Sequence, residues 1–230
     1  LDAACLDADG WLAQSDAFAL LQSAGIRVAP FACAGTGDDL AATAASLGYP
    51  VVLKADVPGV LHKTGAGAVH LGIGDADGLS RAAGAMRLRF PDGRLLLQHQ
   101  VDRGVEAILG VVVPQPGLPL VMAGLGGVSV EADRDVAFAL APLDVPAATR
   151  LLGSLRGRAR FDGSPGGPAF DLPALADALI RLSLLAAALP GVREIDVNPV
   201  SVRPAGEGAI ALDARVRIAS AGTPADRPAP

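Results

Sequence analysis

Residues 47–63, with the sequence LGYPVVLKADVPGVLHK, bring one lysine to the end of an apolar, strand-like run. Lys54 follows Val51, Val52 and Leu53, so its charge would lose hydration unless an anion lies close to it. A lysine ammonium is a compact charge that suits phosphate oxygens. The alternative is a lysine whose ammonium group extends from the strand end into solvent. The run predicts a strand that offers a cation to a phosphate ligand.

The composition limits the classes of protein that this chain can represent. Its 230 residues can bury a core in one domain of two lobes or in two small domains. No apolar run approaches the roughly 18 residues that a membrane helix needs. A net charge of −5 supplies no basic field for nucleic acid. We expect a cytoplasmic protein that binds neither membranes nor nucleic acids.

Helix-like and strand-like segments alternate along the chain, which predicts an α+β fold. The strongest helix signal is the recurrence of leucines at every third or fourth position from Leu172 to Leu189. Helices are expected at 15–24, 38–47, 79–90, 146–155 and 171–189. Strands are expected at 50–55, 67–73, 94–100, 105–113 and 118–123, and in a hairpin of 194–203 with 208–216.

The same pattern divides the chain into regions. Residues 1–24 are expected to pack on the C-terminal lobe, 25–100 to form a small lobe and 101–220 a large lobe. The tail at 221–230, AGTPADRPAP, is expected to be disordered. The chain begins at Leu1 without a basic stretch or an apolar signal core, and we expect it to be part of something longer.

The C-terminal hairpin concentrates oxygen-bearing side chains. Asp196 and Asn198 alternate along one strand, so they point to the same face, and Asp213 is expected on the partner strand. Hard oxygen ligands from adjacent strands suit Mg²⁺. Asp196 has an alternative role, which is to pair with Arg193 or Arg215. An Asp/Asn pair of this kind also occurs as ordinary turn chemistry.

Two glycine-rich segments could approach an anion closely. In the first, Gly65 and Gly67 permit backbone amides to reach phosphate oxygens. In the second, Gly126 and Gly127 could do the same for a phosphoryl group in transfer. Neither is a P-loop, because GxxxxGK[ST] is absent from the sequence. The alternative for the second segment is a plain tight turn with a surface ion pair.

The segments 47–63, 65–73, 124–143 and 194–218 together resemble the ATP-grasp domain of ADP-forming acyl-CoA synthetases, including the acetate-CoA ligase beta subunit and its succinyl-CoA synthetase relatives. The resemblance extends from about Ser15 to Ile218. It implies an ATP-grasp fold of two α+β lobes with the nucleotide site between them. It also implies ATP and Mg²⁺ as cofactors, and the reaction acid + ATP + CoA giving acyl-CoA + ADP + phosphate through a phosphohistidine.

The resemblance also implies roles for individual residues. It makes His62 the phosphoryl relay, with Glu131 and Arg134 positioning the incoming histidine or stabilising charge. The metal ligands that it implies are Asn198 and Asp213, with Asp196 less clearly so. The ATP-binding residues that it implies are Lys54, Lys63, Gly65, Gly67, Gln98, His99 and Glu106.

Several of these roles have alternatives. His62 could instead donate a hydrogen bond to a phosphate or pack under its loop. Glu106 lies in an apolar run, where an unpaired carboxylate would be costly, so a structural salt bridge is the alternative. His99 departs from the family pattern, and a contact with adenine would use its backbone. The arginine of a downstream arginine-glycine pair is not found at PGGPAFD, so its contact would come from Arg156, Arg158 or Arg160.

Nothing in the sequence resembles a CoA-binding or ligase lobe. A CoA-binding ligase alpha subunit or fused domain is therefore expected to supply the sites for CoA and the carboxylic acid. One alternative function is a free-standing ATP-grasp carboxylate-amine ligase. Another is a non-catalytic nucleotide-binding regulatory domain of a larger fusion, such as one with an acetyltransferase.

Overall fold

The computed structural model describes residues 6–7, 9–35, 38–57, 65–102, 104–115, 117–126, 135–165 and 167–219. The chain forms two compact units. The smaller unit comprises residues 29–102, and the larger unit comprises residues 1–28 and 103–230.

The smaller unit is built on a four-stranded antiparallel sheet with the order β1-β4-β2-β3. Its strands are β1 (Phe31–Ala34), β2 (Val51–Asp56), β3 (Val69–Ile73) and β4 (Arg94–His99), and its helices are α2 (Leu40–Leu47) and α3 (Ala76–Arg89). Both helices begin at an aspartate cap. Asp39 accepts hydrogen bonds from the amides of Ala41 and Ala42, and Asp75 accepts one from Gly78.

One face of this sheet forms the core of the smaller unit. Alternate residues of β2 and β4, such as Leu53 and Leu97, pack in a cluster with Leu79 and Met86 of α3. The residues between them, which include Lys54 and Gln98, therefore point to the face away from this cluster.

The larger unit contains a six-stranded antiparallel sheet with the order β10-β8-β5-β6-β7, and β9 pairs with β8 beside β10. Its strands are β5 (Val105–Val112), β6 (Leu120–Leu125), β7 (Val136–Leu140), β8 (Val192–Val202), β9 (Ala209–Ala211) and β10 (Arg215–Ile218). Its helices are α1 (Gln14–Ser23), α5 (Val145–Gly153) and α6 (Leu172–Ala188), with a 3-10 turn at Arg158–Asp162.

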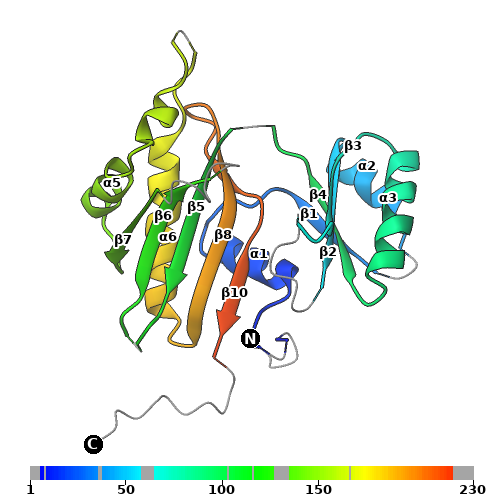
Figure 1. Ribbon diagram of the computed structural model, residues 1–230, viewed down its shortest axis with the longest axis horizontal. Coiled ribbons are helices and arrows are strands. Elements are labelled where there is room, and N and C mark those ends of the chain that lie inside the picture. Colours follow the sequence, from blue (N-terminus) through cyan, green and yellow to red (C-terminus); the bar gives the residue numbers. More distant parts are fainter. Residues whose placement is uncertain are drawn as a thin grey trace, which may run out of the picture. The chain divides into compact units, whose positions relative to one another are not determined.

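Helices α5 and α6 pack against one face of this sheet (Figure 1). Leu175, Leu179 and Leu182 of α6 are fully buried, as the leucine repeat predicts. The sheet buries Val111 and Val121 from alternate positions. This layer of helix on sheet is the core of the larger unit.

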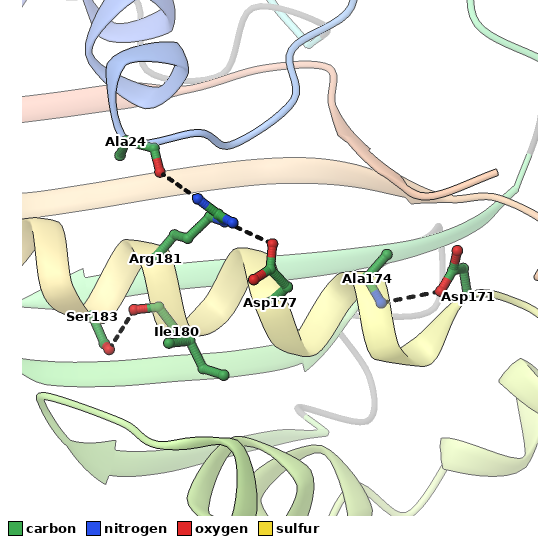
Figure 2. A network of polar contacts seen from close by, with 7 residues as sticks. All are labelled: Ala24, Asp171, Ala174, Asp177, Ile180, Arg181 and Ser183. Atoms are coloured by element: carbon green, nitrogen blue, oxygen red, sulfur yellow. Dashed lines mark hydrogen bonds and ion pairs between the residues drawn. The ribbon is translucent and has the colours of Figure 1, made fainter. Parts of the chain in front are cut away.

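Helix α6 is fixed by polar contacts along its length (Figure 2). Asp171 caps its first turn by accepting from the amide of Ala174. Arg181 pairs with Asp177 at 2.6 Å and donates to the carbonyl of Ala24, which follows α1. The buried hydroxyl of Ser183 donates to the carbonyl of Ile180 and accepts from the amide of Leu143.

Some elements differ from the sequence-based expectation. Helix α3 begins three residues earlier, at Ala76, because Asp75 caps it. The expected hairpin partner of β8 is interrupted, since β9 and β10 both pair with β8 and are separated by residues 212–214. Strands β1 and β7 were not expected. No helix in the described ranges is long and apolar enough to cross a membrane.

Candidate functional site

Lys54 lies on β2, between Leu96 of β4 and Val69 of β3. It is only 5% exposed, although a lysine is almost never this buried unless its charge has a partner. The position on the sheet face away from the hydrophobic cluster separates its side chain from the apolar core. The site on the smaller unit is built around this cation.

Gln98 occupies the same sheet face, where it lies across from Phe31 of β1 and Val52 of β2. The residue is 2% exposed, and its buried Nε2 has no hydrogen-bond partner among the described residues. A buried donor without a partner costs roughly 1–3 kcal/mol. A ligand acceptor would remove that cost, so the amide is suited to binding.

His99 is held by two contacts within the smaller unit. Its Nδ1 lies 2.9 Å from the carbonyl oxygen of Gly48, and its backbone N–H donates to Pro30 at 2.8 Å. The neighbouring N–H of Gln100 donates to Pro50 at 3.0 Å. Because the backbone N–H of His99 is already hydrogen-bonded, a backbone contact with a nucleobase would use its carbonyl oxygen.

The turn at Gly65 and Gly67 follows the segment that includes His62 and Lys63. Gly65 is exposed, and Gly67 has a φ of +70°, a conformation that L side chains rarely adopt. A Cβ at Gly67 would lie 3.1 Å from Nη1 of Arg89. The positive φ is what favours glycine here, because the end of the flexible Arg89 side chain could move away from a Cβ.

The larger unit presents its oxygen-bearing side chains at an irregularity of β8. The pairing of β5 with β8 passes from Leu109↔Val197 to Ala107↔Val200, so two residues of β8 oppose one of β5. These two residues are Asn198 and Pro199, and the side chain of Asn198 is exposed. The bulge therefore lies where an otherwise regular strand carries an exposed amide side chain.

Asp213 is brought beside Asn198 by backbone hydrogen bonds. The N–H of Asn198 donates to the carbonyl of Asp213 at 3.2 Å, and the N–H of Leu212 donates to Pro199 at 2.9 Å. Asp213 lies between β9 and β10, so its expected place within the partner strand is wrong. Because Asp213 lies outside a regular strand, the direction of its side chain is not set by strand alternation.

The carboxylate of Asp213 is oriented by two donors. Its Oδ1 accepts from the amide of Ala214 at 2.9 Å and from Nε2 of Gln14 on α1. Gln14 is 1% exposed and belongs to the buried stripe of α1 that includes Phe18 and Leu21. The sequence analysis missed this residue, although a glutamine on the apolar stripe of an amphipathic helix is a usable signal for a buried polar contact.

The oxygen-bearing side chains of Asn198 and Asp213 fit a hard cation whose other ligands are phosphate and water oxygens. No group of three or more His, Cys, Asp or Glu side chains that could hold a metal occurs within the described ranges. Asn198 and Asp213 alone would leave most positions of a Mg²⁺ ion to phosphate and water oxygens, which is its usual coordination with nucleotides. Asp196 lies directly across from Arg215, so the register is also compatible with an ion pair there.

The sequence predicts that Glu106 of β5 is enclosed in an apolar strand, and this prediction is wrong. Its side chain is exposed, not enclosed in the apolar strand, and no ion pair joins it to another described residue. Its carbonyl accepts from the N–H of Gly126 at 2.7 Å, and a Cβ on Gly126 would lie 2.9 Å from the Cβ of Glu106. The glycine is needed for this close approach, and the carboxylate is left free to meet a ligand.

Gly126, which follows β6, is tied to the segment that precedes α6. Arg160 donates from Nη1 to the carbonyl of Gly126 at 3.2 Å, whereas Arg158 pairs with Asp162 at 3.1 Å. Asp135, which precedes β7, accepts from the amides of Arg156 and Gly157 at 2.9 and 2.8 Å.

Asp135 carries a shifted pKa. Burial raises the pKa of its carboxyl, but the hydrogen bonds from Gly157 and Arg156 and the charge of Arg156 outweigh burial. The net result is a pKa below the ordinary value. Asp135 is therefore charged at neutral pH and holds both backbone amides.

The chain matches the ATP-grasp domain family over residues 3–218. It is 32% identical over 213 residues to the beta subunit of acetate-CoA ligase [ADP-forming] I of Pyrococcus furiosus, covering 89% of this chain and 90% of that subunit. The chain is an ATP-grasp domain of the ADP-forming acyl-CoA synthetase family. The predicted family and the predicted ATP-grasp fold are both confirmed.

Other ATP-grasp relatives agree with this assignment. Acetate-CoA ligase [ADP-forming] I of Archaeoglobus fulgidus is 37% identical over 209 residues, which cover 87% of this chain and 30% of that protein. A structure of the acetyl-coenzyme A synthetase 1 of Ca. Korarchaeum cryptofilum has 31% identity and a TM-score of 0.84, and covers 91% of this chain and 93% of the other. The chain therefore spans about a third of a single-chain relative and nearly all of a separate beta subunit.

The structure groups the predicted residues of this ATP-grasp domain into two sets. Lys54, Gln98, His99 and Gly67 belong to the smaller unit, and Glu106, Asp196, Asn198 and Asp213 to the larger one. Gly65 also belongs to the smaller unit and Gly126 to the larger one. Five predicted residues lie outside the described ranges: His62, Lys63, Gly127, Glu131 and Arg134.

Proposed function

We propose that this ATP-grasp domain binds MgATP and transfers its γ-phosphoryl group as part of an ADP-forming acyl-CoA synthetase. The observation that carries the proposal is the bulge at Asn198, which exposes this side chain and joins its backbone to that of Asp213, whose carboxylate is oriented by two donors. A structure of the Korarchaeum relative contains Mg-AMPPCP, which supports a magnesium nucleotide as the ligand.

The residues of each unit have distinct roles in this proposal. Lys54 neutralises phosphate oxygens, and Gln98 donates from its buried Nε2 to the nucleoside. Asn198 and Asp213 hold the metal, while Gln14 fixes the carboxylate rotamer of Asp213. Bound Mg²⁺ would supply charge neutralisation for the phosphate groups.

His62 is proposed as the phosphoryl relay on the strength of the resemblance. Its imidazole attacks the γ-phosphorus, the bond to the β-γ bridging oxygen breaks, and ADP leaves. The phosphohistidine then gives its phosphoryl group to an acceptor on the CoA-ligase portion. Glu131 and Arg134 are proposed to position that acceptor or to stabilise the transferred charge.

The CoA-ligase portion is proposed as a separate alpha subunit or a fused domain. Its absence from the matched region is consistent with the share of the Archaeoglobus relative, 30%, that this chain covers. CoA and the carboxylic acid would bind to that portion. An enzyme that depends on ATP and CoA also suits the cytoplasmic location expected from the sequence.

Thermal unfolding with and without MgATP tests the proposal. A ligand that binds only the folded state raises Tm by mass action, so MgATP should stabilise the protein. Lys54→Ala and Asp213→Ala should each remove most of that shift. Asp177→Ala is the matched control, because Asp177 makes only a surface ion pair on α6.

Undiminished shifts in both site variants would disprove the proposed nucleotide site. Turnover of an acid, an amine and ATP by this chain alone would instead favour the carboxylate-amine ligase. Binding of MgATP without any phosphoryl transfer, in the presence of the CoA-ligase portion, would favour the regulatory domain.

A further inference from the structure

The sheet of the larger unit has an apolar end that no described element covers. On the face away from α5 and α6, the side chains of β7 remain exposed: 37% for Val136, 52% for Phe138 and 59% for Leu140. Val112 of β5 is 41% exposed. We call these four residues the β7 face. Together they expose on the order of 300 Å² of apolar surface, a size at which patches on monomers are often functional.

Strand register places the β7 face on the same side of the sheet as the oxygen ligands. Phe138 lies across from Met122, Met122 from Gly110, and Gly110 from Asp196. Because directly paired residues of antiparallel strands share a face, the apolar and acidic ends belong to one surface. The β7 face is therefore an extension of the surface that carries the proposed metal site.

Strand β7 is also an edge. In the described part of the chain it pairs only with β6, and its sequence VAFAL contains neither a charged residue nor a proline. Natural proteins protect exposed apolar edges with charges, prolines, bulges or a covering element. The described strand has neither a charge nor a proline, and its pairing with β6 has no bulge, so a covering element is the protection that fits it.

Other exposed apolar side chains do not form a comparable surface. Leu71, Leu88 and Leu184 lie on β3, α3 and α6, while Leu118 precedes β6 and Val145 begins α5, so each belongs to a different part of the chain. Scattered single side chains of this kind are normal on protein surfaces. Among the described residues, exposed apolar side chains form a group only at the β7 face.

We propose that the β7 face is the docking surface for the CoA-ligase portion of the synthetase. The inference rests on the proposed function, since that portion must deliver a phosphoryl acceptor to the nucleotide. Helices α5 and α6 cover the opposite face, so the acceptor has to approach on the face of Asp196 and Asn198. The β7 face offers the docking partner an apolar anchor on that same surface, and about two thirds of the length of the Archaeoglobus relative lies outside the matched region and could cover it.

The test compares two double variants for binding to the CoA-ligase portion of the same synthetase, produced as a separate polypeptide. Phe138→Ser with Leu140→Ser removes the two most exposed side chains of the β7 face. Leu88→Ser with Leu184→Ser is the matched control, because it removes two exposed leucines elsewhere. The β7 variant should bind the partner at least roughly 30-fold more weakly, as expected for interface hot spots. The control should stay within about twofold.

The MgATP-induced shift in Tm, measured on the same variants, separates the two proposals. An unchanged shift together with lost partner binding supports docking at the β7 face. An unchanged shift with unchanged partner binding overturns the docking inference alone. Absence of both the shift and partner binding in the wild type overturns the proposed function, and the inference with it.

Two further measurements distinguish docking from misfolding and from self-association. Hydrogen exchange at the amides of residues 136–140 in the wild-type chain should slow when the partner is added, which does not depend on the folding of any variant. A wild-type chain that is dimeric alone, and monomeric after Phe138→Ser with Leu140→Ser, would overturn the docking inference and assign the β7 face to self-association.

Discussion

The two units present their proposed ligand residues in different ways. In the smaller unit, Lys54 and Gln98 occupy regular strand positions, and the alternation of the strand alone decides which face they take. In the larger unit, Asn198 lies at a bulge and Asp213 in a strand break. Regular positions are fixed by local sequence, whereas irregular positions depend on contacts with distant parts of the chain.

The sharpest test of this comparison is Gln14→Leu. Gln14 is 199 residues from Asp213 and orients its carboxylate, so its loss should weaken a metal site that local sequence does not hold. Loss of such a supporting contact typically lowers metal affinity by roughly 10- to 100-fold. Titration of Mg²⁺ at saturating ATP should detect the change in apparent affinity.

Two outcomes decide the role of Gln14. Gln22→Leu, on the same helix but exposed, should leave Mg²⁺ affinity unchanged. Wild-type Mg²⁺ affinity in Gln14→Leu would mean that the bulge and strand break hold Asp213 without help from α1.

Gln98→Leu tests the regular half of the comparison. The substitution removes a buried donor that lacks a partner among the described residues, so the free protein should become more stable by about 1 kcal/mol. MgATP should bind about tenfold more weakly, because one hydrogen bond to the nucleoside is lost. Urea unfolding measures the first effect, and calorimetric titration with MgATP measures the second.

A substitution that stabilises the free protein and weakens MgATP binding indicates a residue that serves the ligand and not the fold. Gln100→Leu is a useful control, since Gln100 already accepts a hydrogen bond from the amide of Gly72 and should lose stability. Destabilisation of the free protein by Gln98→Leu would show that Gln98 serves the fold.

Asp135→Asn should have the smallest effect, and it should depend on pH. The folded-state pKa of Asp135 is lowered, so its stabilisation is present above the ordinary aspartate value of about 4 and is lost as pH falls through the folded pKa. The variant should be less stable than wild type by about 1 kcal/mol at pH 7, and the difference should vanish in acid.

Urea unfolding at a series of pH values measures this dependence. Asp162→Asn removes an exposed carboxylate with a surface partner and should show little effect at any pH. A constant difference between Asp135→Asn and wild type down to the lowest pH would show that the stabilisation does not come from the charge on Asp135.

Much of the fold followed from local patterns. The leucine repeat of α6 and the apolar runs of β2, β4 and β5 could be recognised because each contains a clear period. Strands β1 and β7 could not, since FACA and VAFAL are short and their alanines give little contrast between faces. The exposure of Glu106 also escaped prediction, because flanking residues do not reveal whether a strand face is covered.

Local patterns were enough to recognise the family, most of the α+β elements and the residue types able to meet a magnesium nucleotide. Spacing along a single strand is enough for that last inference, since side chains alternate with a fixed period. Three features became visible only in the folded chain: the bulge at Asn198, the strand break in which Gln14 orients Asp213, and the exposed apolar side chains of β7. Those features arise from pairing between segments far apart in the chain, whose register and coverage no local pattern encodes.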